Sequence, residues 1–403
     1  MPPNSSIFFN LLRYLVKWLA LAAVVALLAG SASALFLYAL AWVTAWRGAH
    51  PWIIWGLPLA GFAVGWIYLR LGTGVEAGIR LLIDEVRQPR QGVKLRMAPL
   101  VLGATVVSHL FGASVGREGT AVQMGGALAD QLTRVLRLAP EDRRLLILAG
   151  ISAGFASVFG TPVAGAVFAL EVMTLARLRT FAWPAAVLPC VAAAFLADEV
   201  GLRWGVLHTH YALAPVAPIT LLALLATLAA GAIFGLAAMV FTNATHRLAA
   251  FMKRRVAYAP MRPFIGGLAV ALAVWLTAGD RYIGLGIPVI LEAFAHPLSL
   301  LDTVAKTAFT VVSLGSGFKG GEVTPLFYIG ATLGNALAPV LQLPFPMLAA
   351  LGFVAVFAGA AKTPLVSTIM AVELFGPAIA PYAALACAAS YVCSGRAGIY
   401  RPI

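Results

Sequence analysis

The stretch GASVGREGT at residues 112–120 places a single carboxylate, Glu118, among three glycines. It lies between two apolar segments, 98–110 and 121–136, which we expect to be helices. Glycine lets the backbone approach a ligand closely, and the first turn of the following helix presents free N–H groups and the positive end of its dipole. The stretch therefore predicts an anion site at a helix start, with Glu118 standing where the anion would bind. The alternative is that Glu118 merely caps its helix.

A second stretch, GSGFKGGEVTP at residues 315–325, repeats this arrangement with four glycines, followed by Glu322, Thr324 and a proline suited to the first turn of a helix. Protonated Glu322 and Thr324 are both O–H donors, which suits a small anion that has lost its hydrating water. An ionised Glu322 would repel the anion, so the pattern indicates that protons take part. The alternative is a Glu322–Lys319 ion pair with Thr324 as an ordinary helix cap.

The two stretches belong to an internal repeat. Glu118 and Glu322 lie 204 positions apart, and a second match, AGFA to TP to E at 153–171, recurs as AVFA to TP to E at 355–373 with an offset of 202. Repeated halves with short, broken helices are typical of transporters whose inverted repeats meet at the midplane. We expect repeat halves at about 10–250 and 263–403 within one transmembrane transport domain, 1–403, without a soluble domain. Glu171 and Glu373, which the repeat pairs, are expected to be structural hydrogen-bonding partners.

Composition places the chain in a membrane. Of 403 residues, 61% are hydrophobic and 11% are charged, far from the values of soluble domains. Apolar stretches long enough to span a bilayer occur at roughly 15–45, 52–70, 183–200, 218–242 and 263–278, with shorter pieces at 98–112, 145–155, 162–175 and 346–358. The predicted fold class is an all-α integral membrane protein of two inverted-topology repeats, built of tilted, partly re-entrant helices.

The net charge of +13 is concentrated in short blocks, at 87–96, 143–144, 177–179 and 253–255. We interpret these blocks as positive-inside loops or headgroup anchors, not as a nucleic-acid surface. Arg13 and Lys17 predict a cytoplasmic N-terminus, and residues 78–86 are then a short re-entrant piece. The apolar start imitates a signal peptide, but the apolar sequence continues through Trp42, which favours one long tilted span.

The two loops together resemble the CLC family of chloride channels and proton-coupled anion exchangers, and the resemblance covers the chain from about residue 10 to the end. The family's Gly-Lys/Arg-Glu-Gly-Pro motif corresponds to residues 116–120 (GREGT), and its Gly-x-Phe-x-Pro motif to residues 321–325 (GEVTP). Thr120 replaces the family's proline and Val323 its phenylalanine. This variant is similar to the bacterial fluoride-exporting branch of the family.

The resemblance implies roles for particular residues. Glu118 corresponds to the external gating glutamate, and Glu322 with Thr324 to the second-site pair; Glu118 and Glu322 are the expected gating and proton-transfer residues. Tyr400 corresponds to the pore-lining tyrosine. Val172 stands where chloride-type exchangers carry an internal glutamate, which makes Glu322 the candidate relay. The expected anion-binding residues are Gly116, Arg117, Gly119, Gly321, Val323, Thr324, Tyr400, Ile79 and Phe318.

The resemblance predicts a fluoride/proton antiporter that exports fluoride, with fluoride, protons and the bilayer as partners, and with no metal, cofactor or nucleic acid. It implies a homodimer with one pore per subunit, and we expect a multi-pass protein of the bacterial inner membrane. A chloride exchanger or passive anion channel is the alternative in the same class. An intramembrane enzyme is disfavoured because His-Glu-x-x-His and Gly-x-Ser-x-Gly are missing from the sequence, and a membrane scaffold does not need carboxylates flanked by glycine.

Overall fold

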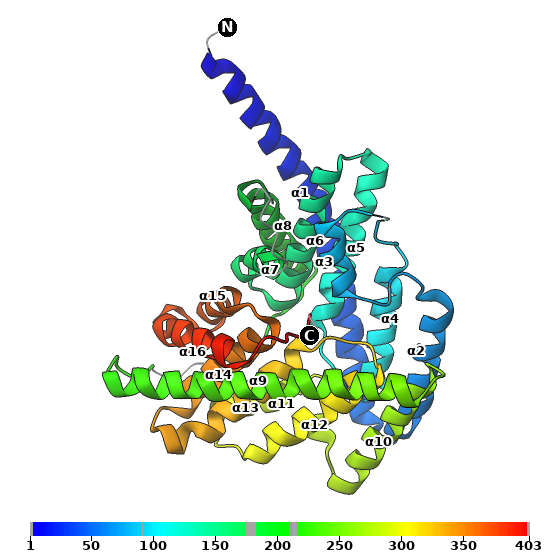
Figure 1. The fold of residues 1–403 in the computed structure, drawn as a ribbon, viewed down its shortest axis with the longest axis vertical. Coiled ribbons are helices and arrows are strands. Elements are labelled where there is room, and N and C mark those ends of the chain that lie inside the picture. Colours follow the sequence, from blue (N-terminus) through cyan, green and yellow to red (C-terminus); the bar gives the residue numbers. More distant parts are fainter. Residues whose placement is uncertain (1–2, 91, 175–182, 210, 212–215, 401–403) are drawn as a thin grey trace.

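The computed structural model describes residues 3–90, 92–174, 183–209, 211 and 216–400, and within them it is helical (Figure 1). The basic residues Arg177 and Arg179 lie outside the described residues. The first eight α-helices are α1 (Pro3–Ala49), α2 (Leu57–Leu71), α3 (Ile79–Arg87), α4 (Met97–Leu110), α5 (Glu118–Leu136), α6 (Pro140–Phe159), α7 (Pro162–Thr174) and α8 (Trp183–Arg203). The next eight are α9 (Leu221–Arg255), α10 (Met261–Thr277), α11 (Ile287–Ala295), α12 (Leu300–Ser316), α13 (Val323–Leu341), α14 (Phe345–Ala361), α15 (Pro364–Phe375) and α16 (Ala380–Cys393). Short 3-10 turns are η1 (Pro51–Gly56), η2 (Asp280–Tyr282) and η3 (Pro377–Ile379).

Five of the described helical segments are long and apolar enough to cross a membrane: Ile7–Ala49, Pro51–Leu71, Pro184–Arg203, Leu221–Arg255 and Val323–Leu341. Four of them overlap with spans that the sequence predicts. The remaining segment, in α13, is not among the predicted spans. Its mean hydropathy is only 1.2, because glycine and polar residues lower it. The fifth predicted span, 263–278, corresponds to α10, which has 17 residues. The protein is therefore a multi-pass membrane protein with many helices that are short for a bilayer.

The N-terminal helix is continuous over 47 residues, as the expectation of one long span requires. Its first turns project away from the other helices in Figure 1, and side chains there, such as Phe8 and Phe9, are exposed. The segment at 78–86 forms the short helix α3, only nine residues long, as a re-entrant piece requires. The apolar stretch predicted at 218–242 is shorter than helix α9. The helix continues to Arg255 through a more polar stretch that begins at residue 243.

The internal repeat recurs in the helix order. Helices α5, α6 and α7 follow one another as α13, α14 and α15 do, and the short α3 has its counterpart in the equally short α11. In this order the long helix α9 is the counterpart of α1. This favours a boundary between the two repeat halves at α8 and α9 over a boundary in the loop at 250–262. The halves are joined in their cores, because one cluster of buried hydrophobic side chains includes residues of α1, α5 and α6 as well as of α13, α14 and α16.

Two carboxylates cross-link the halves by capping each other's helices. Glu171 of α7 accepts hydrogen bonds from the backbone N–H groups of Leu365 (2.9 Å) and Val366 (2.7 Å) at the start of α15. Glu373 of α15 accepts them from Val163 (2.9 Å) and Ala164 (2.8 Å) at the start of α7. These bonds satisfy N–H groups that a helix start leaves open. The expected structural role of the pair is confirmed.

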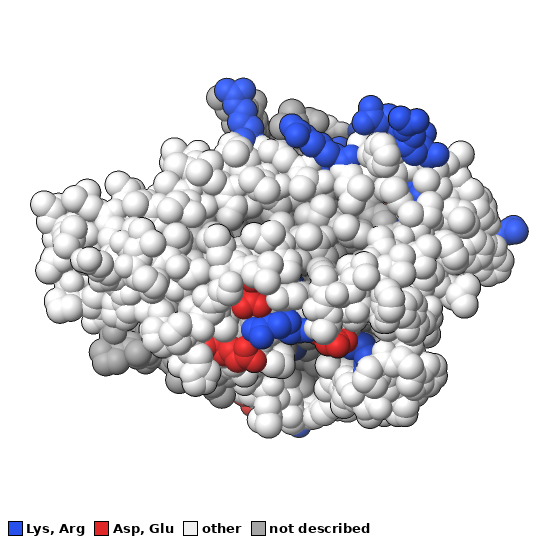
Figure 2. Space-filling view, turned by 90° about the horizontal axis from the view of Figure 1, so that it is seen from below, with Lys and Arg blue, Asp and Glu red and all other residues white. Residues whose placement is uncertain are grey.

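Many basic side chains on one face of the protein lie apart from the acidic ones. On the face in Figure 2 the Lys and Arg side chains lie mainly along the upper edge, whereas the Asp and Glu side chains lie away from it. By the positive-inside rule, we assign the basic edge to the cytoplasmic side. The block at 253–255, at the end of α9, is part of the basic surface: Lys253 and Arg262 line a surface cavity together with Lys319 from the second motif stretch.

Candidate functional site

The two glycine-rich stretches meet in the centre of the molecule. Gly116 donates a backbone hydrogen bond to the carbonyl of Gly321 (2.5 Å), and Gly321 donates one to the carbonyl of Gly116 (2.7 Å). A Cβ atom on Gly116 would lie 2.9 Å from the Gly321 oxygen, and one on Gly321 would lie 2.8 Å from the nitrogen of Gly119. Such distances are too short for a side chain. Glycine is therefore required here so that the starts of α5 and α13 can approach each other.

This contact places Glu118 of α5 at the start of α13. Its carboxylate accepts hydrogen bonds from the backbone N–H of Thr324 (3.1 Å), from the Thr324 hydroxyl and from the N–H of Arg117 (3.1 Å). The Arg117 Nε lies 3.6 Å from the carboxylate, and Glu118 itself is 1% exposed. A carboxylate thus occupies a position whose donors would equally suit a small inorganic anion. Glu118 does not simply cap its own helix, because two of these donors belong to the other half of the chain.

Glu322 is the N-cap residue of α13, two residues before Thr324. Its predicted alternative partner, Lys319, instead lies over the ring of Tyr68, with its Nζ 4.2 Å from the centroid. The described residues contain no Glu322–Lys319 ion pair. Glu322 is partly exposed, toward a cavity of about 300 Å³. Its carboxyl group is therefore reachable from that cavity, whereas Glu118 lies behind it.

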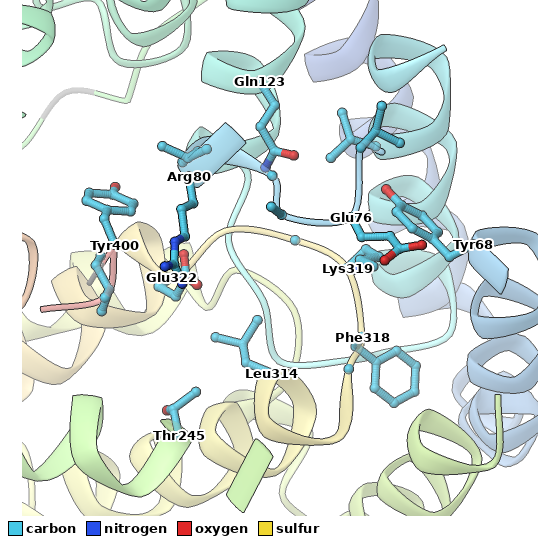
Figure 3. Close-up of a pocket in the computed structure, with 18 residues that line it drawn as sticks. Tyr68, Glu76, Arg80, Gln123, Thr245, Leu314, Phe318, Lys319, Glu322 and Tyr400 are labelled. Carbon is cyan, nitrogen blue, oxygen red and sulfur yellow. The ribbon is translucent and has the colours of Figure 1, made fainter. Parts of the chain in front are cut away.

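The cavity brings together residues from seven separate stretches of the chain (Figure 3). Ile79, at the start of α3, and Tyr400, near the end of the described chain, line it together with Glu322 and Phe318. Phe318 is 4% exposed and belongs to a hydrophobic cluster with Leu57 and Val115, so it acts mainly as part of the wall. The cavity shares Lys319 with the surface cavity beside the basic block at 253–255, which indicates that it opens on the cytoplasmic side.

Tyr400 is held by contacts on both sides of it in the fold. Its ring meets the edge of Phe168 with a centroid separation of 6.3 Å, and the preceding residue, Ile399, donates a hydrogen bond to the carbonyl of Ala360 (2.9 Å). Lys362 fastens the same segment by donating to the Ser394 hydroxyl (2.6 Å) and to the Gly395 carbonyl (2.7 Å). Tyr400 is thus a positioned side chain and not a loose terminal one.

Three positions that depart from the family pattern have packing roles. The hydroxyl of Thr120, which replaces the family's proline, lies 2.7 Å from the hydroxyl of Thr105 in α4. Val323, in place of phenylalanine, is 1% exposed. Val172, at the position of the internal glutamate, is 3% exposed and belongs to the hydrophobic core. The site of that glutamate is therefore apolar here.

A second, much smaller cavity of about 20 Å³ lies on the far side of Glu118. It is lined by Arg117, Glu118, Thr209, Tyr211 and Thr324 and by apolar side chains. Its volume is close to that of one water molecule by the same measure. Glu118 thus lines this small cavity and does not line the wide inner one, whose lining includes Glu322.

Sequence reasoning missed four residues at the inner cavity and beside its wall: Glu76, Arg80, Gln123 and Lys362. Glu76 lies three residues before the predicted Ile79, and Arg80 directly follows it. Gln123 donates a hydrogen bond to the carbonyl of Gly119 (2.9 Å). No motif marks these positions. A charged residue next to an apolar helix start was the available signal, but such residues are common at membrane surfaces.

Known proteins resemble the chain along most of its length. The model of the voltage-gated chloride channel family matches residues 60–395. A chloride/fluoride channel protein of Pseudomonas syringae pv. tomato is 62% identical over 397 residues, which cover 97% of this chain and 87% of that protein. An H(+)/Cl(-) exchange transporter ClcA of Cronobacter sakazakii is 27% identical, covering 88% of this chain and 81% of that protein.

Among solved structures, a CLC-type fluoride/proton antiporter superposes with a TM-score of 0.91 at 34% sequence identity, covering 96% of this chain and 97% of that one. Because it covers 96% of the chain, the likeness extends well beyond the two motif loops. Both the resemblance drawn from the two loops and the helical fold expected from it are thereby confirmed.

Proposed function

The chain belongs to the voltage-gated chloride channel family, and from that premise we propose that it is a proton-coupled antiporter that exports fluoride in exchange for protons. The observation that carries the proposal is the contact of Glu118 with Thr324, because there a carboxylate occupies a buried set of N–H and O–H donors. The same donors suit fluoride, which is small and accepts strong hydrogen bonds. The 34% identical fluoride/proton antiporter structure supports this choice of ion.

Glu118 is proposed as the gate. Ionised, it competes with the anion for the donors of Thr324 and closes the path; protonated, it loses much of its attraction for them and leaves the site. Arg117, 3.6 Å from the carboxylate, keeps the site attractive to negative charge when Glu118 departs. One residue thereby moves a proton and admits an anion, which is what coupled exchange requires.

Glu322 is proposed as the second proton carrier. It reaches the inner cavity and precedes Thr324 at the start of α13. When protonated it is an O–H donor to the anion, and when it releases the proton it repels the anion from the site. Val172 supplies no carboxyl group for a separate proton route, so Glu322 takes both roles in this proposal.

The other predicted residues are proposed to form the lining of the anion path. Gly116, Gly119 and Gly321 allow the close approach of the two helix starts, and Tyr400 offers a phenol donor at the inner cavity. Ile79, Phe318 and Val323 are apolar and exclude water around the ion. An anion without competing water interacts more strongly with the few donors that remain.

We further propose that the chain works as a single transport domain in the bacterial inner membrane and forms a homodimer with one pore per subunit. The path proposed here runs within one chain, because Glu118, Thr324, Glu322 and Tyr400 all belong to it. A chloride/proton exchanger and a passive anion channel are the competing functions. The 27% identical H(+)/Cl(-) exchanger is the observation that favours the chloride/proton exchanger among these two.

The test is transport by the purified protein in liposomes, followed with fluoride- and chloride-selective electrodes while proton movement is recorded. We expect fluoride efflux to drive proton uptake, and chloride to move far more slowly. Coupled chloride flux at a similar rate would identify a chloride exchanger. Fluoride flux that leaves the proton concentration unchanged would identify a channel.

A further inference from the structure

The charged side chains around the inner cavity are not all paired. Glu76, Arg80, Lys319 and Glu322 line it, and with Gln123 and Tyr400 they make one wall polar. In Figure 3, Tyr68, Glu76 and Lys319 lie together on one side of the cavity, and Arg80, Glu322 and Tyr400 lie on the other. The two basic side chains are therefore in different surroundings.

Lys319 is held in the wall. Its Nζ lies 4.2 Å from the centroid of the Tyr68 ring, a cation–π contact, and Glu76 is the acidic side chain that acts on it electrostatically. Both neighbours attract the ammonium group. Lys319 is thus drawn toward this side of the wall by attractions that compete with an anion in the cavity.

Arg80 has no such partner. It is an exposed residue of α3, and no described residue forms an ion pair or a side-chain hydrogen bond with it. The turn at Gly78 has a φ of +59°, after which Ile79 is buried. The next helical position is rotated by about 100°, as 3.6 residues per turn require, and it carries the guanidinium out of the packed interface. In Figure 3 the Arg80 side chain extends toward the side of the cavity on which Glu322 and Tyr400 lie.

We infer that Arg80 binds a small monovalent inorganic anion as it enters the inner cavity from the cytoplasm. The ion would contact Arg80 before it reaches Glu322 and Thr324. An unpaired cation inside a concave, low-dielectric wall raises the local concentration of anions. Because Arg80 remains open to water, it holds the ion weakly, and weak holding is needed for passage. This role rests on the proposed function only in the identity of the ion, since any small anion that the protein carries would meet the same residue.

The test compares Arg80→Gln, Arg80→Lys and Arg247→Gln in liposomes, with the anion varied on the cytoplasmic face. Arg247 is an exposed arginine of α9 that does not line the cavity. We expect Arg80→Gln to raise the KM for the anion by roughly three- to tenfold, as loss of a steering charge does, with kcat and the number of protons per anion unchanged. Arg80→Lys should restore most of the affinity, and Arg247→Gln should behave as the parent protein. The difference should shrink at high ionic strength, because salt screens an exposed charge.

An unchanged KM in Arg80→Gln would overturn the inference. If the proton-to-anion ratio changed at the same time, Arg80 would be a counter-ion of Glu322 instead. The proposed function fails separately: if the parent protein carries chloride and not fluoride, the fluoride assignment is wrong, and the KM for chloride still tests Arg80.

Discussion

Gly116 and Gly321 exchange two backbone hydrogen bonds, of 2.5 and 2.7 Å, although 205 positions separate them in the chain. This pair brings the starts of α5 and α13 together and so sets the position of Glu118 against Thr324. A fixed backbone contact is better suited to this than side chains, because it cannot change rotamer when the gate moves.

Gly116→Ala should destabilise the protein, because its Cβ would lie 2.9 Å from the Gly321 carbonyl oxygen. We expect a loss of about 1–3 kcal/mol, the usual cost of overpacking, measured as a lowered unfolding temperature in detergent. Gly103→Ala is the matched control, since its Cβ would have no neighbour within 4 Å. Equal stability of the two variants would show that the contact of the loops has room to relax.

Glu118→Gln should mimic a permanently protonated gate. Proton coupling should disappear, while anion movement becomes either uncoupled or stalled, because the amide cannot release a proton. The measurement is proton uptake driven by a fluoride gradient, with Glu141→Gln as the control, whose side chain is 77% exposed. Retained proton uptake in Glu118→Gln would remove this residue from the gating role.

Thr324→Val keeps the shape of the side chain but deletes a donor that now serves Glu118. Losing a hydrogen bond to a charged group costs about 1.5–3 kcal/mol, so fluoride binding should weaken by roughly one to two orders of magnitude. Thr324→Ser retains the hydroxyl and should bind nearly as the parent does. Calorimetry of fluoride binding distinguishes these outcomes, and unchanged binding in Thr324→Val would reduce the residue to a helix cap.

Glu322→Gln keeps a hydrogen-bond donor but cannot release a proton, so we expect it to bind fluoride and to fail at coupled turnover. Glu322→Ala should lose both, because neither donor nor proton carrier remains. Fluoride and proton fluxes should be recorded together under an imposed fluoride gradient. Normal coupling in Glu322→Gln would mean that the proton travels by another route.

Lys362→Met should loosen the segment that carries Tyr400, because it deletes the bonds to Ser394 and Gly395. Hydrogen exchange at the Ile399 amide, which donates to Ala360, should accelerate, while amides in the middle of α14 stay protected. Lys94→Met is the control, since Lys94 bonds to the exposed carbonyl of Thr73 and not to the segment at 394–400. Equal protection of Ile399 in both variants would show that the segment is held without Lys362.

The membrane class, the repeat and the motif residues could be predicted because they depend on local properties. Apolar length predicts helices in a bilayer, and a glycine-flanked carboxylate before an apolar run predicts a helix start that binds an anion. Glu118, Glu322 and Thr324 were found in this way. Helix boundaries were less predictable: the polar end of α9 remains helical, whereas hydropathy alone suggested that it would stop near residue 242.

What the sequence by itself determined is therefore which residues are candidates for the chemistry, and the tertiary structure decided which of them meet. That the Glu118 carboxylate reaches Thr324 depends on how two halves of the chain pack. The capping of α15 by Glu171, and the opening of one cavity to both Arg80 and Tyr400, depend on the same packing. The physical reason is that spacing along a chain constrains contacts only within a helix or a turn. Contacts over some 200 positions arise from burying apolar faces and satisfying open backbone groups together.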